Sequence, residues 1–287
     1  MMKLNGKKVF QICNTISMLF LVFITAYPMY YVIIASISDP IALARYKGAL
    51  WAPLEPYTLH AYKEILSHRL VVSGFRNTLF ILVVGTTLNV LFTAIGAFFL
   101  TIKGPMLKNI VATMIIITMY FSGGLVPTYL VVKNLGMMNT LWSLMLPGLI
   151  GTTYLIIMKT AFQSIPDSLQ ESALLDGASY FQILLKVMLP LSKATLAVMV
   201  LYYGVAHWNA WFSASIYLRD TSLYPIQLVA HNMLDNAALM EAGAETDRYA
   251  ELLKYALIVV VSGPIIMVYP FIQKYFAQGV MIGAIKG

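Results

Sequence analysis

The sequence predicts an all-α membrane protein with six transmembrane helices. Of its 287 residues, 60% are hydrophobic and 11% are charged, against roughly 25% charged residues in a soluble domain. Six stretches contain no Lys, Arg, Asp or Glu: 9–38, 77–102, 109–132, 134–158, 194–218 and 255–273. Each is long enough to cross a bilayer, which takes about 20 residues of helix. Because backbone polar groups must be paired within hydrocarbon and barrel strands are only about ten residues long, we expect helices.

The first uncharged stretch, 9–38, follows Lys3, Lys7 and Lys8, as the apolar core of a secretory signal would. Its 30 residues greatly exceed the roughly 7–15 residues of such a core. We therefore expect a membrane span. Cys13 is the only cysteine in the sequence, so an internal disulfide is impossible and a structural role is expected.

The third and fourth stretches contain residues that break helices. Gly123 and Gly124 precede Pro127 in the third stretch, and Gly148 follows Pro147 in the fourth. Interrupted spans often line a translocation pathway, although Pro and Gly are also common in ordinary membrane helices. We expect the third span to be interrupted, with Gly123 and Gly124 as candidate pathway residues, and the fourth is open to the same interpretation.

The distribution of charge predicts an orientation. With a cytoplasmic N-terminus, the inside comprises 1–8, 103–108, 159–193 and 274–287, with ten basic residues against three acids, and the outside has nine of each. The positive-inside rule discounts long loops, and the two long outside loops hold all but one of those nine basic residues. We expect both termini in the cytoplasm. The net charge of +7 then reflects topology, and no basic stripe with aromatic residues suggests nucleic-acid binding.

The cytoplasmic loop between the fourth and fifth stretches has apolar residues at helical spacing. Asp167 with Gln170, or Ser168 with Glu171, has the spacing of a capping box, and either pair is suited to start a helix. Gly177 is the residue best suited to end it in a left-handed turn. The loop is therefore predicted to begin with a short helix that stops at Gly177.

The same capping-box spacing recurs at Ser179 and Gln182, which predicts a second helix directly after the glycine. Leu174, Leu175 and Ala178 are expected to face one way, as a small apolar ridge on an otherwise polar element. Such a ridge is suited to dock against another protein.

This loop resembles the EAA motif of binding-protein-dependent ABC importer permeases: E-A-A, three residues, G, nine residues, then I-x-L-P. The corresponding residues here are Glu171, Ser172, Ala173, Gly177, Val187, Leu189 and Pro190. Ser replaces the second-position Ala and Val replaces Ile. The resemblance implies the type I ABC importer permease fold. In that fold, 1–75 would form an N-terminal span and external segment, 76–287 the core transmembrane domain, and 163–192 its cytoplasmic coupling loop.

In that family the coupling helix sits in a groove on an ATPase subunit and transmits its motion to the membrane helices, a helix-in-groove contact. The resemblance implies that Glu171 contacts the ATPase or caps its own helix, that Ala173 permits close approach, and that Leu174 and Leu175 are apolar anchors. The full set of implied coupling residues is Glu171, Ala173, Leu174, Leu175, Asp176, Gly177, Val187, Leu189 and Pro190.

Other segments resemble the carbohydrate branch of the same family. These are "HWNAWFSASIYLRD", "SLYPIQL" and the glycine-rich "YFAQGVMIGAIKG", whose Gly279 and Gly283 are then expected to approach the ATPase. Within that branch, "YFSGGLVPTYL" and "YPIQLV" resemble permeases for oligosaccharides that work with lipoprotein-type binding proteins. The sequence contains no G-x-x-x-x-G-K-[ST], so ATP and Mg are expected on a partner ATPase and no cofactor on this chain.

The partners that the resemblance implies are a second permease in a heterodimer, an ATPase dimer and an extracytoplasmic sugar-binding protein. The implied location is a bacterial plasma (inner) membrane, with a multi-pass chain in the lipid bilayer. For a sugar pathway, the fifth stretch offers Tyr203, Trp208, Asn209 and Trp211, which combine aromatic faces with hydrogen-bonding groups. The alternative is an interfacial aromatic belt, because Trp and Tyr gather at membrane interfaces.

Three other functions are weighed against an oligosaccharide importer. The same architecture would serve a non-sugar solute. An autonomous secondary transporter would carry ionisable residues or inverted repeats in its spans, and all six stretches are uncharged. A membrane-embedded enzyme would need acids, histidines or a metal set at membrane depth, and His60, His68, His207 and His231 lack metal-ligand spacing. We therefore expect a transport subunit with no catalytic residue and no metal.

Overall fold

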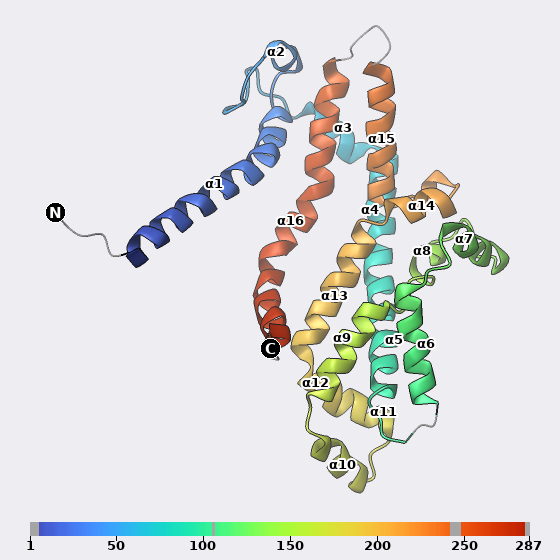
Figure 1. Cartoon of the computed structure of the whole chain (residues 1–287). Coiled ribbons are helices and arrows are strands. Elements are labelled where there is room, and N and C mark those ends of the chain that lie inside the picture. The colour runs from blue at the N-terminus through green and yellow to red at the C-terminus, as the bar shows by residue number, and fades with distance from the viewer. Residues whose placement is uncertain (1–5, 105–106, 242–247, 285–287) are drawn as a thin grey trace. The chain divides into compact units, whose positions relative to one another are not determined.

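The computed structural model describes residues 6–104, 107–241 and 248–284, and all regular structure in these ranges is helical (Figure 1). Two compact units can be separated: Met1–His68 with Ala230–Pro264, and Arg69–Val229 with Ile265–Gly287. Helices α15 (Ile226–Glu241) and α16 (Arg248–Ala284) contribute to both units.

The first unit begins with α1 (Gly6–Ala35), followed by α2 (Pro40–Arg45) and α3 (His60–Ser67). The Asp39 side chain accepts a hydrogen bond from the Ala42 amide at 2.8 Å and so caps α2, as short polar side chains do at helix starts. Ala35, Leu43 and Leu50 form a small buried core. Most of α1 is exposed and apolar within the chain, which is the surface expected of a helix that lipid surrounds.

The second unit contains the remaining helices. In order they are α4 (Arg69–Phe80), a wide π turn (Ile81–Gly85), α5 (Thr86–Phe99), α6 (Lys108–Tyr120), α7 (Leu125–Asn134), α8 (Trp142–Met145), α9 (Thr152–Gln163), α10 (Asp167–Leu175), α11 (Tyr180–Ile183), a second π turn (Leu184–Met188), α12 (Leu189–Leu191), α13 (Lys193–Trp208), α14 (Trp211–Tyr217) and a 3-10 turn (Thr221–Leu223). The helices α4 and α5 form one apolar span, Arg69–Phe99.

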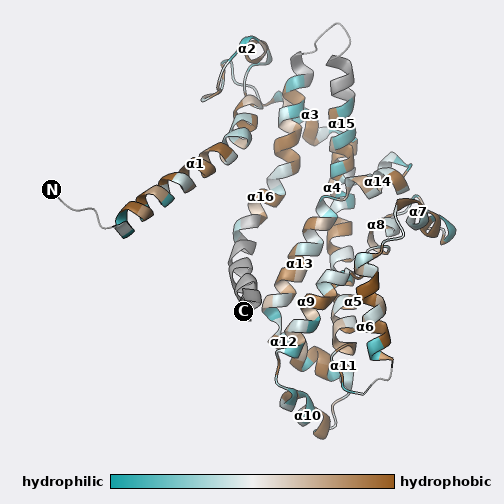
Figure 2. Ribbon diagram, viewed as in Figure 1, coloured by the Kyte–Doolittle hydropathy of each residue, from teal (hydrophilic) through white to brown (hydrophobic). Residues whose placement is uncertain are grey.

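Three helices in the described ranges are long and apolar enough to cross a membrane: Gly6–Ala35, Arg69–Phe99 and Glu251–Val268. A fourth is added if Tyr180–Leu191 and Lys193–Trp208, which are bent by 88°, are counted as one. Helix α6 is apolar, and Figure 2 colours most of it brown, but it has only 13 residues. The count of six spans and the cytoplasmic location of both termini stay predictions.

The expected third and fourth spans are both interrupted. Helix α6 ends at Tyr120 and α7 begins at Leu125, which confirms the predicted break at Gly123 and Gly124. The fourth stretch, 134–158, is also broken, as the sequence left open at Pro147 and Gly148, because Met145 ends α8 and α9 begins only at Thr152. Proline lacks the N–H that a helix needs and glycine adds conformational freedom, so Pro147 and Gly148 account for the break.

The irregular backbone at 146–151 finds its hydrogen-bond partners inside the bundle. The Asn89 side-chain amide on α5 donates to the carbonyls of Gly148 and Leu149, both at 2.9 Å. The Gly151 amide donates to the Tyr203 hydroxyl of α13 at 2.9 Å. Non-helical backbone is tolerated at membrane depth only where protein or water pairs it. These side chains therefore allow the fourth predicted span to be broken.

A buried core holds α5, α9, α11 and α13 together. Its members include Phe98 from α5, Met158 and Phe162 from α9, and Met188 and Met199 from the second π turn and α13. The rings of Phe98 and Phe162 meet edge to face at 6.4 Å between centroids, which is a favourable aromatic geometry. This core is the support on which the loop 163–192 is mounted.

Candidate functional site

Helix α10 ends in a Schellman motif at Gly177. The Gly177 amide donates to the Leu174 carbonyl at 3.0 Å, and the Ala178 amide donates to the Ala173 carbonyl at 2.9 Å. Gly177 has φ +79°, and a side chain added there would meet nothing within 4 Å. The glycine is thus required for its left-handed backbone, which other residues adopt at a cost, and for no close contact within this chain. This confirms the predicted glycine stop.

Helix α10 begins where it was expected, directly after Pro166, but its cap differs from the prediction. Pro166 occupies the N-cap position, and no side chain caps the helix, because proline carries no side-chain acceptor. The two predicted capping boxes, from Asp167 to Gln170 and from Ser168 to Glu171, are therefore wrong. The carboxylates of Asp167 and Glu171 instead bind the Lys103 ammonium, at 2.7 and 3.4 Å.

Lys103 lies in the segment that follows α5, so the ion pairs link this segment to α10. Hydrogen bonds with Asp167 and then Glu171 raise the pKa of the Lys103 amine above its ordinary value. All three side chains are mostly exposed, and ion pairs between exposed groups are weak and screened by salt. They orient α10 more than they stabilise the fold.

The two faces of α10 have different surroundings. Leu174 is 42% exposed and Leu175 is 89% exposed, so both predicted anchors are available to a partner. Ala173 and Ala178 are partly buried against the core of the unit. The expectation that Ala178 shares the outward ridge is therefore wrong, because the Schellman turn brings the residue after Gly177 back against the helix. Figure 1 shows α10 at one end of the second unit.

The second helix of the loop begins as predicted. The Gln182 amide donates to the Ser179 hydroxyl at 3.3 Å, and the Ser179 amide donates to the Gln182 side-chain oxygen at 2.8 Å. Both halves of the capping box are thus present, and each satisfies a backbone N–H that the helix itself leaves free.

The last three motif residues lie inside the unit. Val187 and Leu189 pack partly buried against the core, and Pro190 lies in the short α12. Directly after Leu191 the chain turns by 88° into α13. At this bend the buried Ser192 donates its amide to the Met188 carbonyl at 3.1 Å. The motif therefore joins an exposed helix, α10, to a buried support, and Asp176 is exposed between them.

The four candidate pathway residues of the fifth stretch fall into two pairs. Tyr203 and Trp208 are 4% and 6% exposed, and the Tyr203 hydroxyl shares a 2.7 Å hydrogen bond with Thr93. Asn209 and Trp211 are accessible at the break between α13 and α14. The first pair packs the bundle, whereas the second pair presents polar and aromatic groups to the outside of this chain.

The four remaining candidate glycines lie at the break between α6 and α7 and in α16. Gly123 and Gly124 are exposed at the break between α6 and α7, and Gly124 has φ +87°. Gly279 and Gly283 belong to the last turns of α16, and their surroundings lie outside the described residues. In the part of the chain that the structure describes, no cluster of three or more His, Cys, Asp or Glu side chains is suited to a metal ion.

One polar contact was not predicted. His207 Nε2 on α13 and the Asn89 side-chain oxygen on α5 lie 2.6 Å apart. A Cβ on Gly85 would lie only 2.7 Å from the same histidine nitrogen, so glycine at this position makes the contact possible. A polar Asn inside an apolar stretch was the available signal, because such residues seek partners within the bundle.

Comparison with known proteins identifies the family. Residues 94–282, about two thirds of the chain, match the family described as the binding-protein-dependent transport system inner membrane component. The chain belongs to this family. Membership agrees with an all-helical fold that presents its EAA-like helix at one end of the second unit.

Two relatives of this inner membrane component come from Bacillus subtilis (strain 168). The protein LplC is 37% identical over 98% of this chain and 96% of its own length. The polygalacturonan/rhamnogalacturonan transport system permease protein YtcP is 36% identical over 80% of this chain and 82% of its own. A crystal structure of a bacterial ABC transporter involved in import of the acidic polysaccharide alginate contains a chain with a TM-score of 0.86. That chain is 28% identical, and the match covers 96% of this chain and 99% of that one.

Proposed function

We propose that this inner membrane component is a permease subunit of an ATP-driven importer for sugars, oligosaccharides in particular. An extracytoplasmic binding protein would deliver the substrate, and the permease would span a bacterial plasma membrane beside a second permease. Support comes from the family match over 94–282 and from relatives whose names refer to polysaccharide transport.

The observation that carries the coupling part of the proposal is the two-faced helix α10. Its inner face holds to the core through Ala173, and Ala178 packs there after the turn, while Leu174 and Leu175 project outward. A short helix with apolar anchors on its free face is suited to a groove on another protein. We propose that this groove belongs to the ATPase subunit and that Glu171 and Asp176 contribute polar contacts at its rim.

Within this mechanism the partner ATPase binds ATP and Mg and hydrolyses the ATP, and this chain contributes α10, the helix that moves with the ATPase. Binding of ATP would favour one state of the permease and hydrolysis the other, because a ligand shifts an equilibrium between states that it binds unequally. Val187, Leu189 and Pro190 would carry the displacement of α10 into the core. Gly279 and Gly283 are proposed to approach the same ATPase.

For the substrate path, we propose that Asn209 and Trp211 contact sugar and that Tyr203 and Trp208 support the wall behind them. The exposed break at Gly123 and Gly124 is proposed to face the same path. An amide beside an aromatic ring suits the hydroxyls and apolar faces of a sugar.

The proposal is tested by Gly177→Asp in cells that express the chain with its partner subunits. The predicted outcome is normal membrane insertion, loss of the co-purifying ATPase, and a fall in labelled oligosaccharide uptake of more than about tenfold. A charge left unpaired in a docking interface costs several kcal/mol, and each 1.4 kcal/mol is about tenfold.

The matched control is Gly136→Asp. Gly136 also has positive φ, +70°, and open space around it, so the substitution introduces the same charge and the same backbone strain away from α10. Uptake should survive it. If Gly177→Asp retains both the ATPase and uptake, the coupling proposal is wrong and an autonomous transporter becomes the better explanation. Uptake of only non-sugar solutes would assign the same architecture to another substrate.

A further inference from the structure

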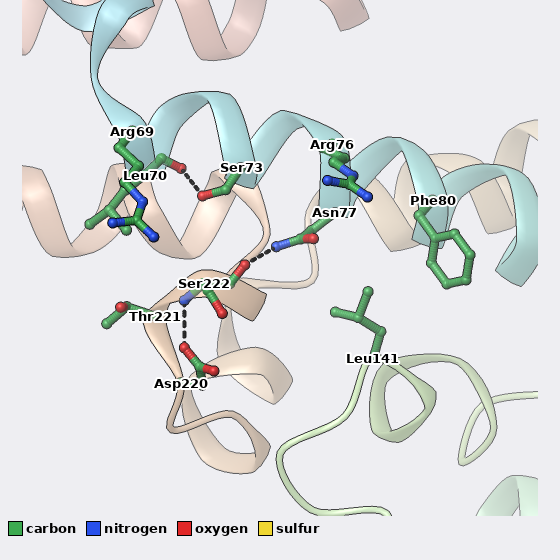
Figure 3. A pocket seen from close by; sticks show the side chains of 10 residues that line it. All are labelled: Arg69, Leu70, Ser73, Arg76, Asn77, Phe80, Leu141, Asp220, Thr221 and Ser222. Atoms are coloured by element: carbon green, nitrogen blue, oxygen red, sulfur yellow. Dashed lines mark hydrogen bonds between the residues drawn. The ribbon is translucent and has the colours of Figure 1, made fainter.

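A cleft of about 620 Å³ opens within the second unit. One wall is α4, and the other includes the turn from Asp220 to Ser222, between α14 and α15 (Figure 3). Within this unit, α4 and α14 lie at the end away from α10 (Figure 1). If α10 faces the cytoplasm, the cleft belongs to the external side, where a substrate arrives.

Two arginines dominate the charge of the cleft. Arg69 and Arg76 are seven residues apart on α4, so they share one face of the helix and are separated by about 10 Å along its axis. Both side chains are exposed, and neither has an ion-pair or hydrogen-bond partner among the residues that the structure describes. A guanidinium group presents paired donors that match the two oxygens of a carboxylate.

The groups between the arginines suit a sugar ring. Ser73 and Asn77 lie on the same stretch of α4 (Figure 3). The Asn77 side-chain amide donates to the Ser222 carbonyl at 2.8 Å and the Tyr224 carbonyl at 3.1 Å, which fixes the amide and leaves its oxygen as an acceptor. Phe80 lines the same cleft with a ring that is 42% exposed.

Among the described residues, Asp220 is the only carboxylate that lines this cleft. Its Oδ1 accepts the Ser222 amide at 2.8 Å, and this hydrogen bond holds the pKa of Asp220 below its ordinary value. The group is therefore an anion at neutral pH. Two arginines against one carboxylate leave a net charge of +1, so the cleft attracts anions, and Asp220 weakens that attraction.

We propose that this cleft binds a carboxylate-bearing sugar, a uronic acid unit of an oligosaccharide. The inference rests on the proposed sugar import and narrows its substrate class to acidic oligosaccharides. An acidic peptide from a docking protein would also satisfy the arginines. It would not account for the hydroxyl and amide groups beside an open aromatic ring, which match the hydroxyls and apolar face of a sugar.

The test uses the assembled transporter, with its ATPase and binding protein, in liposomes. ATP-dependent uptake is measured for trisaccharides of galacturonic, glucuronic and mannuronic acid and for their methyl esters, which keep the ring and remove the charge. Arg69→Gln and Arg76→Gln should each raise the KM for a preferred acid roughly tenfold, because hydrogen bonds to charged groups are the strong ones. The KM for its ester should not change.

Asp220→Asn should act in the opposite direction. It keeps the oxygen that accepts the Ser222 amide and removes the like charge, so the KM for the acid should fall. Arg45→Gln is the matched control, since Arg45 is an exposed arginine of α2 that does not line the cleft, and this variant should behave as the wild type.

Several outcomes overturn the inference. Equal losses for acid and ester, together with weaker attachment of the binding protein, would assign the arginines to protein docking. Unchanged kinetics in both arginine variants would remove them from substrate recognition. A wild-type transporter that imports neutral oligosaccharides but none of the acids would refute the acidic substrate and leave the proposed function standing. Failure to import any oligosaccharide would refute both.

Discussion

In the loop 163–192, the role of one residue follows from its own backbone, whereas the role of another depends on a distant partner. Gly177 is defined by its own backbone, since it has positive φ and no neighbour that would exclude a side chain. The contact that Glu171 makes depends on a residue 68 positions away, because its carboxylate binds Lys103. The glycine stop was therefore predictable from the sequence, whereas the partner of Glu171 was not.

Lys103 provides a prediction at this scale. Lys103→Met removes the positive charge that holds Asp167 and Glu171 and keeps most of the side-chain length. We expect uptake coupled to ATP to fall modestly at low salt, and the difference from the wild type to shrink as salt rises, because exposed ion pairs are screened. The measurement is ATP-dependent uptake at several salt concentrations.

The sign of the pH dependence follows from the raised pKa of Lys103. The ion pair contributes fully below the unfolded pKa, about 10.4, and is lost only as the pH rises through the higher folded value. The ratio of uptake by the wild type to uptake by the variant should therefore stay constant between pH 6 and pH 9. Near neutral pH, His is the side chain that normally titrates, and Lys103 keeps its charge. A ratio that varies steeply across that range would contradict this account of Lys103.

At the scale of elements, features set by residues close together in the sequence were predicted, whereas features set by contacts between distant residues were not. The helix at Tyr180 was predicted because Ser179 and Gln182 are three residues apart and cap it reciprocally. The start of α10 just after Pro166 was also predicted, but its cap was not, because Pro166 occupies the N-cap position and no side chain caps the helix. The break over 146–151 is stabilised by Asn89 and Tyr203, and sequence spacing does not reveal contacts between such distant positions.

Ser179→Ala tests how much the capping box holds the second helix of the loop. Loss of an N-cap side chain costs about 1 kcal/mol, which corresponds to roughly fivefold faster local opening. Hydrogen exchange at the amides of Ser179, Gln182 and Ile183, which are hydrogen-bonded at this cap, should accelerate by about that factor. Exchange in α9, which lies outside this cap, should be unchanged. Equal exchange in the variant and the wild type would mean that core packing alone fixes this helix.

At the scale of the whole molecule, the helical class was predictable from the composition and the family from one motif. The motif needs only residues close together in the sequence. The number of spans is harder to predict. Uncharged stretches show where a chain tolerates lipid, whereas a break such as the one after Met145 is stabilised by side chains elsewhere in the bundle. Within the described ranges, three helices meet the length and hydropathy expected of a span.

The orientation is testable because Cys13 is the only cysteine. In a Cys13→Ser background, single cysteines at Ala49, Leu135 and Ser172, all exposed, report on three loops. A membrane-impermeant maleimide added to intact spheroplasts should label the first two and reach position 172 only after permeabilisation. Labelling of position 172 from outside would reverse the predicted topology, and protection of position 135 would contradict the six-span count.

The 88° bend after Leu191 gives the loop the geometry of a lever with two arms at a right angle. Two stiff arms, Tyr180–Leu191 and Lys193–Trp208, meet at nearly a right angle, so a push along the first arm arrives broadside on the second. A broadside force tilts α13 about a pivot. It does not slide the helix along its own axis, which would drag every packed side chain past its neighbours in a core as dense as an organic crystal. If α10 docks on the ATPase as proposed, such tilting would let a small displacement at that end of the bundle widen the other end.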